Sequence, residues 1–107
     1  MPSSYLRMEQ VLKAFADDGR IEIMKILYDS NTPLIVSEIR PELTVKKDLS
    51  PGQIFGHLKK LVTEGIAYRK PVFRDEGPTV EYAMTPRGRD LYKSVMEAYE
   101  RFEQGMC

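Results

Sequence analysis

Apolar residues recur at helical spacing in two segments near the start of the chain. Between about residues 4 and 16, four of them fall at positions i, i+3, i+4 and i+7, namely Met8, Val11, Leu12 and Phe15. This spacing predicts an amphipathic helix. A second helix is predicted from about Arg20 to Tyr28, and either Asp17 or Asp18 can act as its N-cap.

The segment from residue 29 to residue 49 carries weaker signals. Residues 29–33 have the composition of a loop, and the apolar run 34–36 suits a short strand. Ser37 can cap a brief helix that continues to Leu43, and Pro41 weakens this helix because proline has no N–H to donate. Residues 44–49 are expected to be a connection.

The clearest local signal is the start of the next helix. Ser50 at the N-cap, Pro51 at the first helical position and Gln53 at the third form a capping box. The helix is predicted to reach about Thr63 or residue 64, where Gly65 supplies a left-handed C-terminal residue. Its buried stripe is Ile54, Leu58 and Leu61.

A hairpin and a long helix complete the pattern. Residues 66–74 and 79–84 are predicted strands, and Asp75-Glu76-Gly77-Pro78 between them has turn chemistry. Pro71 fits only an edge or irregular strand position. The pair Thr85-Pro86 then starts a helix that we expect to end near Gln104.

This order of elements predicts the fold class. Residues 1–107 are expected to form a single domain that is mainly α with a small β-hairpin (α+β). A capped helix that follows a short helix and precedes a hairpin is typical of a winged helix-turn-helix. The N- and C-terminal helices, the latter at about residues 85–104, are expected to form a dimer interface.

The charge is zero overall but unevenly distributed. Residues 40–74 hold eight Lys or Arg and three Asp or Glu, a net charge of +5, between flanking segments at −2 and −3. A basic central segment is what a DNA-binding surface requires, because Lys and Arg neutralise phosphates. The roughly 12 Å wide major groove of B-DNA admits one helix.

Three stretches resemble known regulators. Residues 12–27, LKAFADDGRIEIMKIL, resemble the opening of ArsR-type regulators. Residues 57–61, HLKKL, followed by EGIA at 64–67, resemble a passage shared by ArsR-, MarR- and PadR-like proteins, and YAMTPRGRDL at 82–91 resembles their exit from the wing. The resemblance implies a winged-helix transcriptional regulator that binds double-stranded DNA.

Two departures from this pattern matter. Residues 41–51 are longer than the usual tight turn, so the reading helix can be set differently. The segment VSEIR at 36–40 stands where some ArsR proteins carry metal-sensing cysteines, which argues against a soft-metal sensor. A single His and a single Cys likewise predict no metal site and no cofactor.

The candidate DNA-binding residues cluster on the reading helix and its neighbours. Gln53 suits paired hydrogen bonds to adenine, and Lys60 suits guanine or phosphate. The full set is Lys46, Lys47, Ser50, Gln53, Gly56, His57, Lys59, Lys60, Arg69, Lys70 and Arg74. Alternatives stay open: Gln53 can serve only its capping box, His57 can bond locally, and the lysines can be a solvated face. The acidic tip, Asp75 and Glu76, can hold the wing off the DNA.

The last helix has an apolar face wide for a terminal helix, and its polar face is acidic. We therefore expect a homodimer, with the alternative that this helix only covers its own core. The candidate interface residues are Val11, Phe15, Leu91, Tyr92, Val95, Met96, Tyr99 and Phe102. Cys107 is expected to be a free thiol or, in an oxidising setting, an intersubunit disulfide.

These features favour a sequence-specific DNA-binding regulator, a dimeric repressor that occupies a palindromic site. The alternative is a winged-helix module that binds another protein. No phosphate loop, catalytic carboxylate pair or nucleophile motif is present, so we expect no enzyme. No apolar run suits a membrane span or signal peptide, so we expect no membrane partner and a cytoplasmic location. A small-molecule effector is left open.

Overall fold

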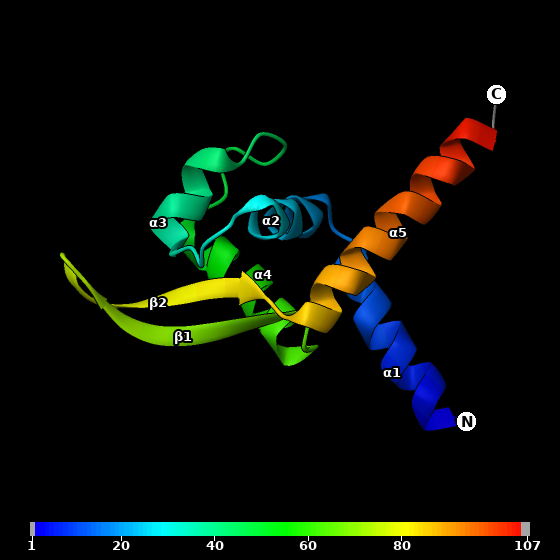
Figure 1. The fold of residues 1–107 in the computed structure, drawn as a ribbon, viewed down its shortest axis with the longest axis horizontal. Coiled ribbons are helices and arrows are strands. Elements are labelled where there is room, and N and C mark those ends of the chain that lie inside the picture. The colour runs from blue at the N-terminus through cyan, green and yellow to red at the C-terminus, as the bar shows by residue number, and fades with distance from the viewer. Residues whose placement is uncertain (1, 106–107) are drawn as a thin grey trace.

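The hairpin and the two terminal helices project from opposite sides of a central group of helices (Figure 1). The computed structural model describes residues 2–105. Its elements in chain order are α1 (Pro2–Leu12), the 3-10 turn η1 (Lys13–Phe15), α2 (Asp18–Asp29), α3 (Val36–Ile39), the 3-10 turn η2 (Arg40–Glu42), α4 (Pro51–Thr63), β1 (Ala67–Arg74), β2 (Gly77–Met84) and α5 (Pro86–Gly105). The prediction of a mainly helical fold with one hairpin is confirmed.

The first two predicted helices are present with shifted boundaries. The α-helical part of the first ends at Leu12 and continues as η1. The second begins at Asp18 because Asp17 is its N-cap, and the Oδ1 atom of Asp17 accepts a hydrogen bond of 3.1 Å from the backbone N–H of Arg20. This bond satisfies one of the free N–H groups at the start of the helix.

The segment from residue 34 to residue 43 differs from its prediction. Only Leu34 behaves as a strand residue, and its backbone pairs with Tyr82 on β2. Helix α3 already begins at Val36, so Ser37 is not its N-cap. Instead, Glu38 caps the helix through its Oε1 atom, which accepts from the backbone N–H of Ile35 at 3.0 Å. The α-helix ends at Ile39, and the chain around Pro41 tightens into η2.

Helix α4 starts as predicted. The Ser50 hydroxyl accepts from the backbone N–H of Gln53 at 3.2 Å, and the Gln53 carboxamide oxygen accepts from the backbone N–H of Ser50 at 2.8 Å. The helix ends at Thr63, and Gly65 follows with a φ of 77°, the left-handed conformation that glycine adopts without strain.

Strands β1 and β2 form a two-stranded antiparallel sheet in which Arg74 pairs with Gly77. The predicted four-residue turn is therefore only Asp75-Glu76, and Gly77 and Pro78 belong to β2. Gly77 has a φ of 116°, which closes this short turn. Pro71 is tolerated because both strands of a two-stranded sheet are edges.

One core joins the helices to the base of the hairpin. Its fully buried side chains include Ile23 and Met24 of α2 and Ile54, Leu58 and Leu61 of α4. Helix α5 is capped by Thr85, whose hydroxyl accepts from the backbone N–H of Gly88 at 3.0 Å. A Cβ atom at Gly88 would lie 2.0 Å from the carbonyl oxygen of Ile66, so the close approach of α5 to β1 requires glycine.

Candidate nucleic-acid interface

The face of α4 that points away from the core is almost bare. With 3.6 residues per turn, the positions opposite Ile54, Leu58 and Leu61 are Gly52, Gly56, Lys59 and Thr63. All four are exposed. A Cβ atom at Gly56 would meet nothing within 4 Å, and one at Gly52 would meet only the Ser50 hydroxyl at 3.9 Å. This bare strip lets another molecule approach the helix backbone closely.

Gln53 and His57 lie to one side of this strip. Gln53 is exposed, although its carboxamide oxygen is engaged in the capping box. His57 is half-buried: its Nε2 atom lies 3.7 Å from the Oδ1 atom of Asp17, and its Nδ1 atom lies 3.4 Å from Nη1 of Arg20. The backbone N–H of Arg20, and to a lesser degree the nearby His57, lower the pKa of Asp17. The structure thus gives His57 the local contacts that the sequence left as an alternative.

Lys60 points toward α1. Its Nζ atom lies 3.2 Å from a carboxylate oxygen of Glu64 and 3.3 Å from the side-chain oxygen of Gln10. Glu64 is only 7% exposed and also accepts from Arg7 of α1 at 2.8 Å. The charge of Lys60 is therefore partly offset within the chain, and its side chain contributes to the contact between α1 and α4.

Arg74 also has internal partners. Its Nη2 atom lies 3.2 Å from a carboxylate oxygen of Glu38 on α3 and 3.0 Å from one of Glu81 on β2. The two carboxylates, with Glu38 contributing most, raise the pKa of Arg74. The backbone N–H of Ile35, followed by Arg74, lowers the pKa of Glu38. These contacts join the distal end of β1 to the helical body.

The remaining candidate cations are more exposed. The Nζ atom of Lys46 lies 3.7 Å from the Oδ1 atom of Asp18, and both side chains are exposed to solvent. Four further candidates are exposed and have no ion-pair partner among the residues that the structure describes, namely Lys47, Lys59, Arg69 and Lys70. They come from the connection before α4, from α4 itself and from β1.

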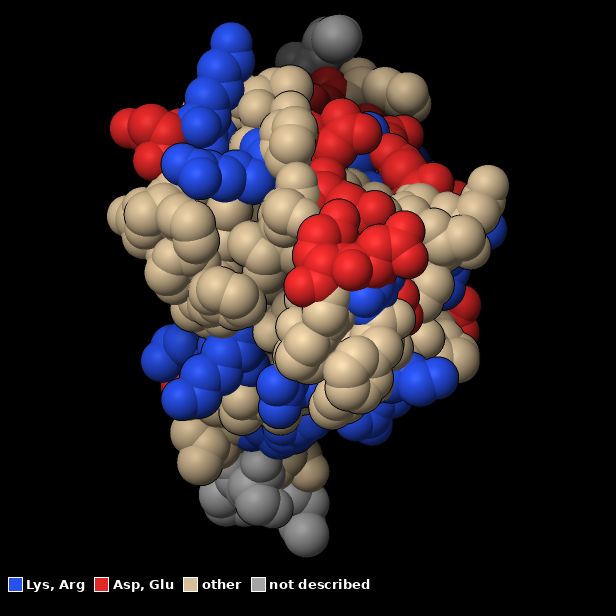
Figure 2. Space-filling view, turned by 90° about the vertical axis from the view of Figure 1, so that its left-hand side faces the viewer, with Lys and Arg blue, Asp and Glu red and all other residues tan. Residues whose placement is uncertain are grey.

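Figure 2 views the molecule from the side on which the hairpin tip projects. Asp and Glu gather near the centre of this face, while Lys and Arg form groups to its left and below (Figure 2). Asp75 and Glu76 at the turn are both exposed. The tip of the hairpin is thus acidic and its stem, which carries Arg69 and Lys70, is basic.

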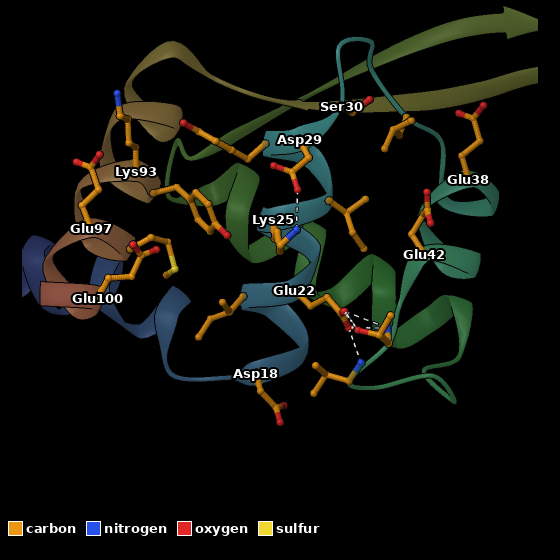
Figure 3. A pocket seen from close by; sticks show the side chains of 18 residues that line it. Asp18, Glu22, Lys25, Asp29, Ser30, Glu38, Glu42, Lys93, Glu97 and Glu100 are labelled. Atoms are coloured by element: carbon orange, nitrogen blue, oxygen red, sulfur yellow. Dashed lines mark hydrogen bonds and ion pairs between the residues drawn. The ribbon is translucent and has the colours of Figure 1, made fainter. Parts of the chain in front are cut away.

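A groove of about 1180 Å³ lies over the outer face of α2. Helix α5 forms one wall of the groove, and α3 with the residues that follow it forms the other. Helix α4 lies behind α2 in this view (Figure 3). The groove has an apolar floor with Ile26 and Tyr92 and a mostly acidic rim that includes Glu97 and Glu100. Lys25 pairs with Asp29 at 2.7 Å within it. Carboxylates therefore concentrate on the side of α2 that faces away from α4.

The terminal helices expose more apolar surface than the sequence indicated. Tyr99 and Phe102 of α5 are exposed, and their ring centroids lie 6.4 Å apart. Tyr92, another interface candidate, is buried and packs on Tyr28 with ring centroids 5.0 Å apart, so it belongs to the chain's own core. The candidates Val11, Phe15, Leu91, Val95 and Met96 are half-buried. Further exposed residues lie on α1, namely Tyr5, Leu6, Met8 and Leu12.

Several contacts could not be found from local sequence signals. Arg7 and Glu64 are 57 positions apart, and Arg74 and Glu38 are 36 positions apart. Cys107 lies outside the described residues. Within residues 2–105, no group of three or more His, Cys, Asp or Glu side chains is arranged to hold a metal ion, and no helix is long and apolar enough to cross a membrane.

Comparison with known proteins agrees with this geometry. Residues 19–102 match a family described as "Winged helix DNA-binding domain". No curated protein matches the chain.

Solved structures share the fold at low sequence identity. A putative MarR-family regulator from Enterococcus faecalis V583 has a TM-score of 0.75 at 20% identity, over 98% of this chain and 86% of that one. The diamide-treated YodB protein from B. subtilis has a TM-score of 0.72 at 21% sequence identity, over 94% of this chain and 92% of that one. A PadR-like transcription factor from Bacteroides fragilis has a TM-score of 0.69 at 16% identity, over 97% of this chain and 95% of that one.

Proposed function

The chain belongs to the winged helix DNA-binding domain family, and on that premise we propose that it is a sequence-specific transcriptional regulator that acts as a homodimer. The family is one of DNA-binding domains and not of enzymes. The observation that carries the proposal is the bare strip of α4, on which Gly52 and Gly56 lie beside Lys59. A helix face with glycine at two successive turns lets the floor of a major groove approach the helix backbone.

In this proposal, some exposed side chains on and around α4 contact bases and others bind phosphates. Lys59 lies on the strip and Gln53 lies beside it, and both reach base edges or nearby phosphates. Lys47 in the connection and Arg69 and Lys70 on the stem of the wing bind the phosphate backbone and fix the register of α4. The acidic tip of the wing, by contrast, stays out of contact with phosphates.

The exposed apolar surface of α1 and α5 supports the homodimer. Tyr5 of α1 is 68% exposed and Phe102 of α5 is 63% exposed, and groups of exposed apolar side chains mark interaction surfaces. Two-fold association of these helices would present two copies of α4, and binding to adjacent half-sites requires them about 34 Å apart, one turn of DNA. The preferred site is then an inverted repeat, and a repressor role follows where such a site overlaps a promoter.

Selection of bound duplexes from a random DNA pool tests the proposal. We expect an enriched inverted repeat, and Lys59→Ala should lower the salt dependence of its binding by about 0.9 in log–log slope if this lysine contacts a phosphate. Lys93→Ala on α5 is the matched control, because it removes an exposed lysine away from α4. Failure of micromolar protein to retard any duplex at low salt would rule out the regulator and leave the protein-binding module.

Light scattering tests the dimer separately. Phe102→Glu places a charge on the exposed apolar face of α5 and should halve the measured mass. The same variant should retain its helical circular dichroism, because Phe102 lies outside the buried core. A monomeric wild-type protein would refute the homodimer. The selection of bound duplexes would then test whether single copies of the protein bind DNA.

A further inference from the structure

Arg74 occupies an unusual place for a basic residue of a wing. It is the last residue of β1, next to the turn that forms the tip of the hairpin. The side chain is only 28% exposed, because it folds back along the sheet to Glu81 and across to Glu38. The Nε atom donates to Glu81 at 3.1 Å, and the two terminal nitrogens donate to the two oxygens of Glu38 at 3.3 and 3.2 Å.

Glu38 links this contact to the helix-turn-helix. Its Oε1 atom accepts from Arg74 and also from the backbone N–H of Ile35, which caps α3. Helix α3 in turn packs against α4. The guanidinium of Arg74 therefore connects the far end of the hairpin to α3, the helix that precedes the proposed reading helix.

We propose that Arg74 is a positioning residue that clamps the wing to α3 and does not itself contact DNA. The inference rests on the proposed function and deepens it. A phosphate contact would require Arg74 to give up two carboxylates with which it already forms charge-assisted hydrogen bonds. The adjacent Asp75 and Glu76 would also repel the phosphate. Arg69 and Lys70 are exposed on the same strand and remain available to bind the phosphate backbone of DNA.

Glu38→Gln separates the two possible roles of Arg74 by the sign of its effect. Glutamine keeps an oxygen that can accept from Ile35, so the cap of α3 is retained while the charge is lost. If Arg74 is a clamp, this variant releases the wing and weakens binding to the selected duplex by a few-fold, at most about ten-fold. If Arg74 contacts a phosphate, removing its competitor strengthens binding, and the clamp is refuted.

Arg74→Ala gives a second, independent measure. The clamp predicts a similar few-fold loss of affinity with an unchanged slope of log affinity against log salt, because no phosphate contact is lost. Arg69→Ala, a matched arginine on the same strand, should lower that slope by about 0.9. A reduced slope for Arg74→Ala would also overturn the proposal.

Hydrogen exchange tests the clamp without DNA. Both Glu38→Gln and Arg74→Ala should speed exchange of the backbone amides near the hairpin tip, and the double variant should be no faster than either single one. Exchange equal to that of the wild-type protein would refute the clamp. A wild-type protein that binds no DNA but shows this pattern would refute the regulator and keep the clamp, so the two failures are distinguishable.

Discussion

Replacing Gly56 by alanine should raise the stability of the protein and lower its affinity for DNA. Gly56 lies in the middle of α4, between Pro51 and Thr63, and its φ is negative. Alanine in place of glycine in a helix interior is worth about 0.8–1.0 kcal/mol. Because an added Cβ would meet nothing within 4 Å, no clash offsets this gain. For a chain of this size, a gain of 1 kcal/mol corresponds to a rise in Tm of about 5 °C.

The same methyl group should obstruct binding. It would stand on the bare strip, where the proposed reading helix comes closest to the DNA, and overpacking of a tight contact costs about 1–3 kcal/mol. We therefore expect the affinity for the selected duplex to fall by about five-fold or more. Thermal unfolding, at one protein concentration because a dimer makes Tm concentration-dependent, and fluorescence anisotropy with labelled duplex measure the two effects.

Ser94→Ala is the matched control, because it adds helix propensity at an exposed position of α5. It should raise Tm slightly and leave DNA binding unchanged. Gly56→Ala protein that is more stable and binds DNA as well as wild type would show that the outer face of α4 is not the docking surface. A destabilised Gly56→Ala protein would show that the space around this residue is not open.

Three further changes test the contacts that hold the fold. Glu64→Gln should lower the free energy of unfolding in urea by about 1–2 kcal/mol, because it leaves two basic partners without the buried carboxylate. Gly88→Ala should cost at least about 2 kcal/mol in thermal unfolding, since its Cβ would overlap the Ile66 carbonyl. Asp17→Ala should cost about 1 kcal/mol near neutral pH. The pKa of Asp17 is lowered by folding, so its contribution is present above the ordinary value of 3.8 and should disappear as pH falls through the lower, folded value.

The sequence predicted best those features whose physical cause lies within four residues. The capping box of Ser50 and Gln53, the left-handed Gly65 and the cap at Thr85 are each set by a backbone N–H or C=O that a nearby residue must satisfy. Such signals fixed the start of α4 and α5. The same logic failed at Ser37, where Glu38 caps the helix from inside its first turn.

The sequence could not predict which basic residues remain available for DNA. Lys60 and Lys59 are neighbours of equal charge, yet only Lys60 reaches a carboxylate, because the buried Glu64 lies one turn further along the same side of the helix. Arg74 pairs with Glu38 only because the folded chain brings the end of β1 next to α3. These pairs depend on tertiary structure, and composition or periodicity cannot report them.

The neutral net charge of the chain is compatible with a DNA-binding surface because the carboxylates are placed elsewhere. Some, such as Glu64 and Glu38, are occupied by internal partners, and others line the groove on the side of α2 that faces away from α4. On the proposed function, this separation of charge would orient an approaching duplex toward the exposed cations around α4. Only four of the candidate DNA-binding cations lack an ion-pair partner among the described residues, so we expect non-specific attraction to phosphate to be weak. In the proposed dimer, affinity would come from base contacts along α4 and from two copies acting together, so the bare strip and the exposed faces of α1 and α5 belong to the same proposal.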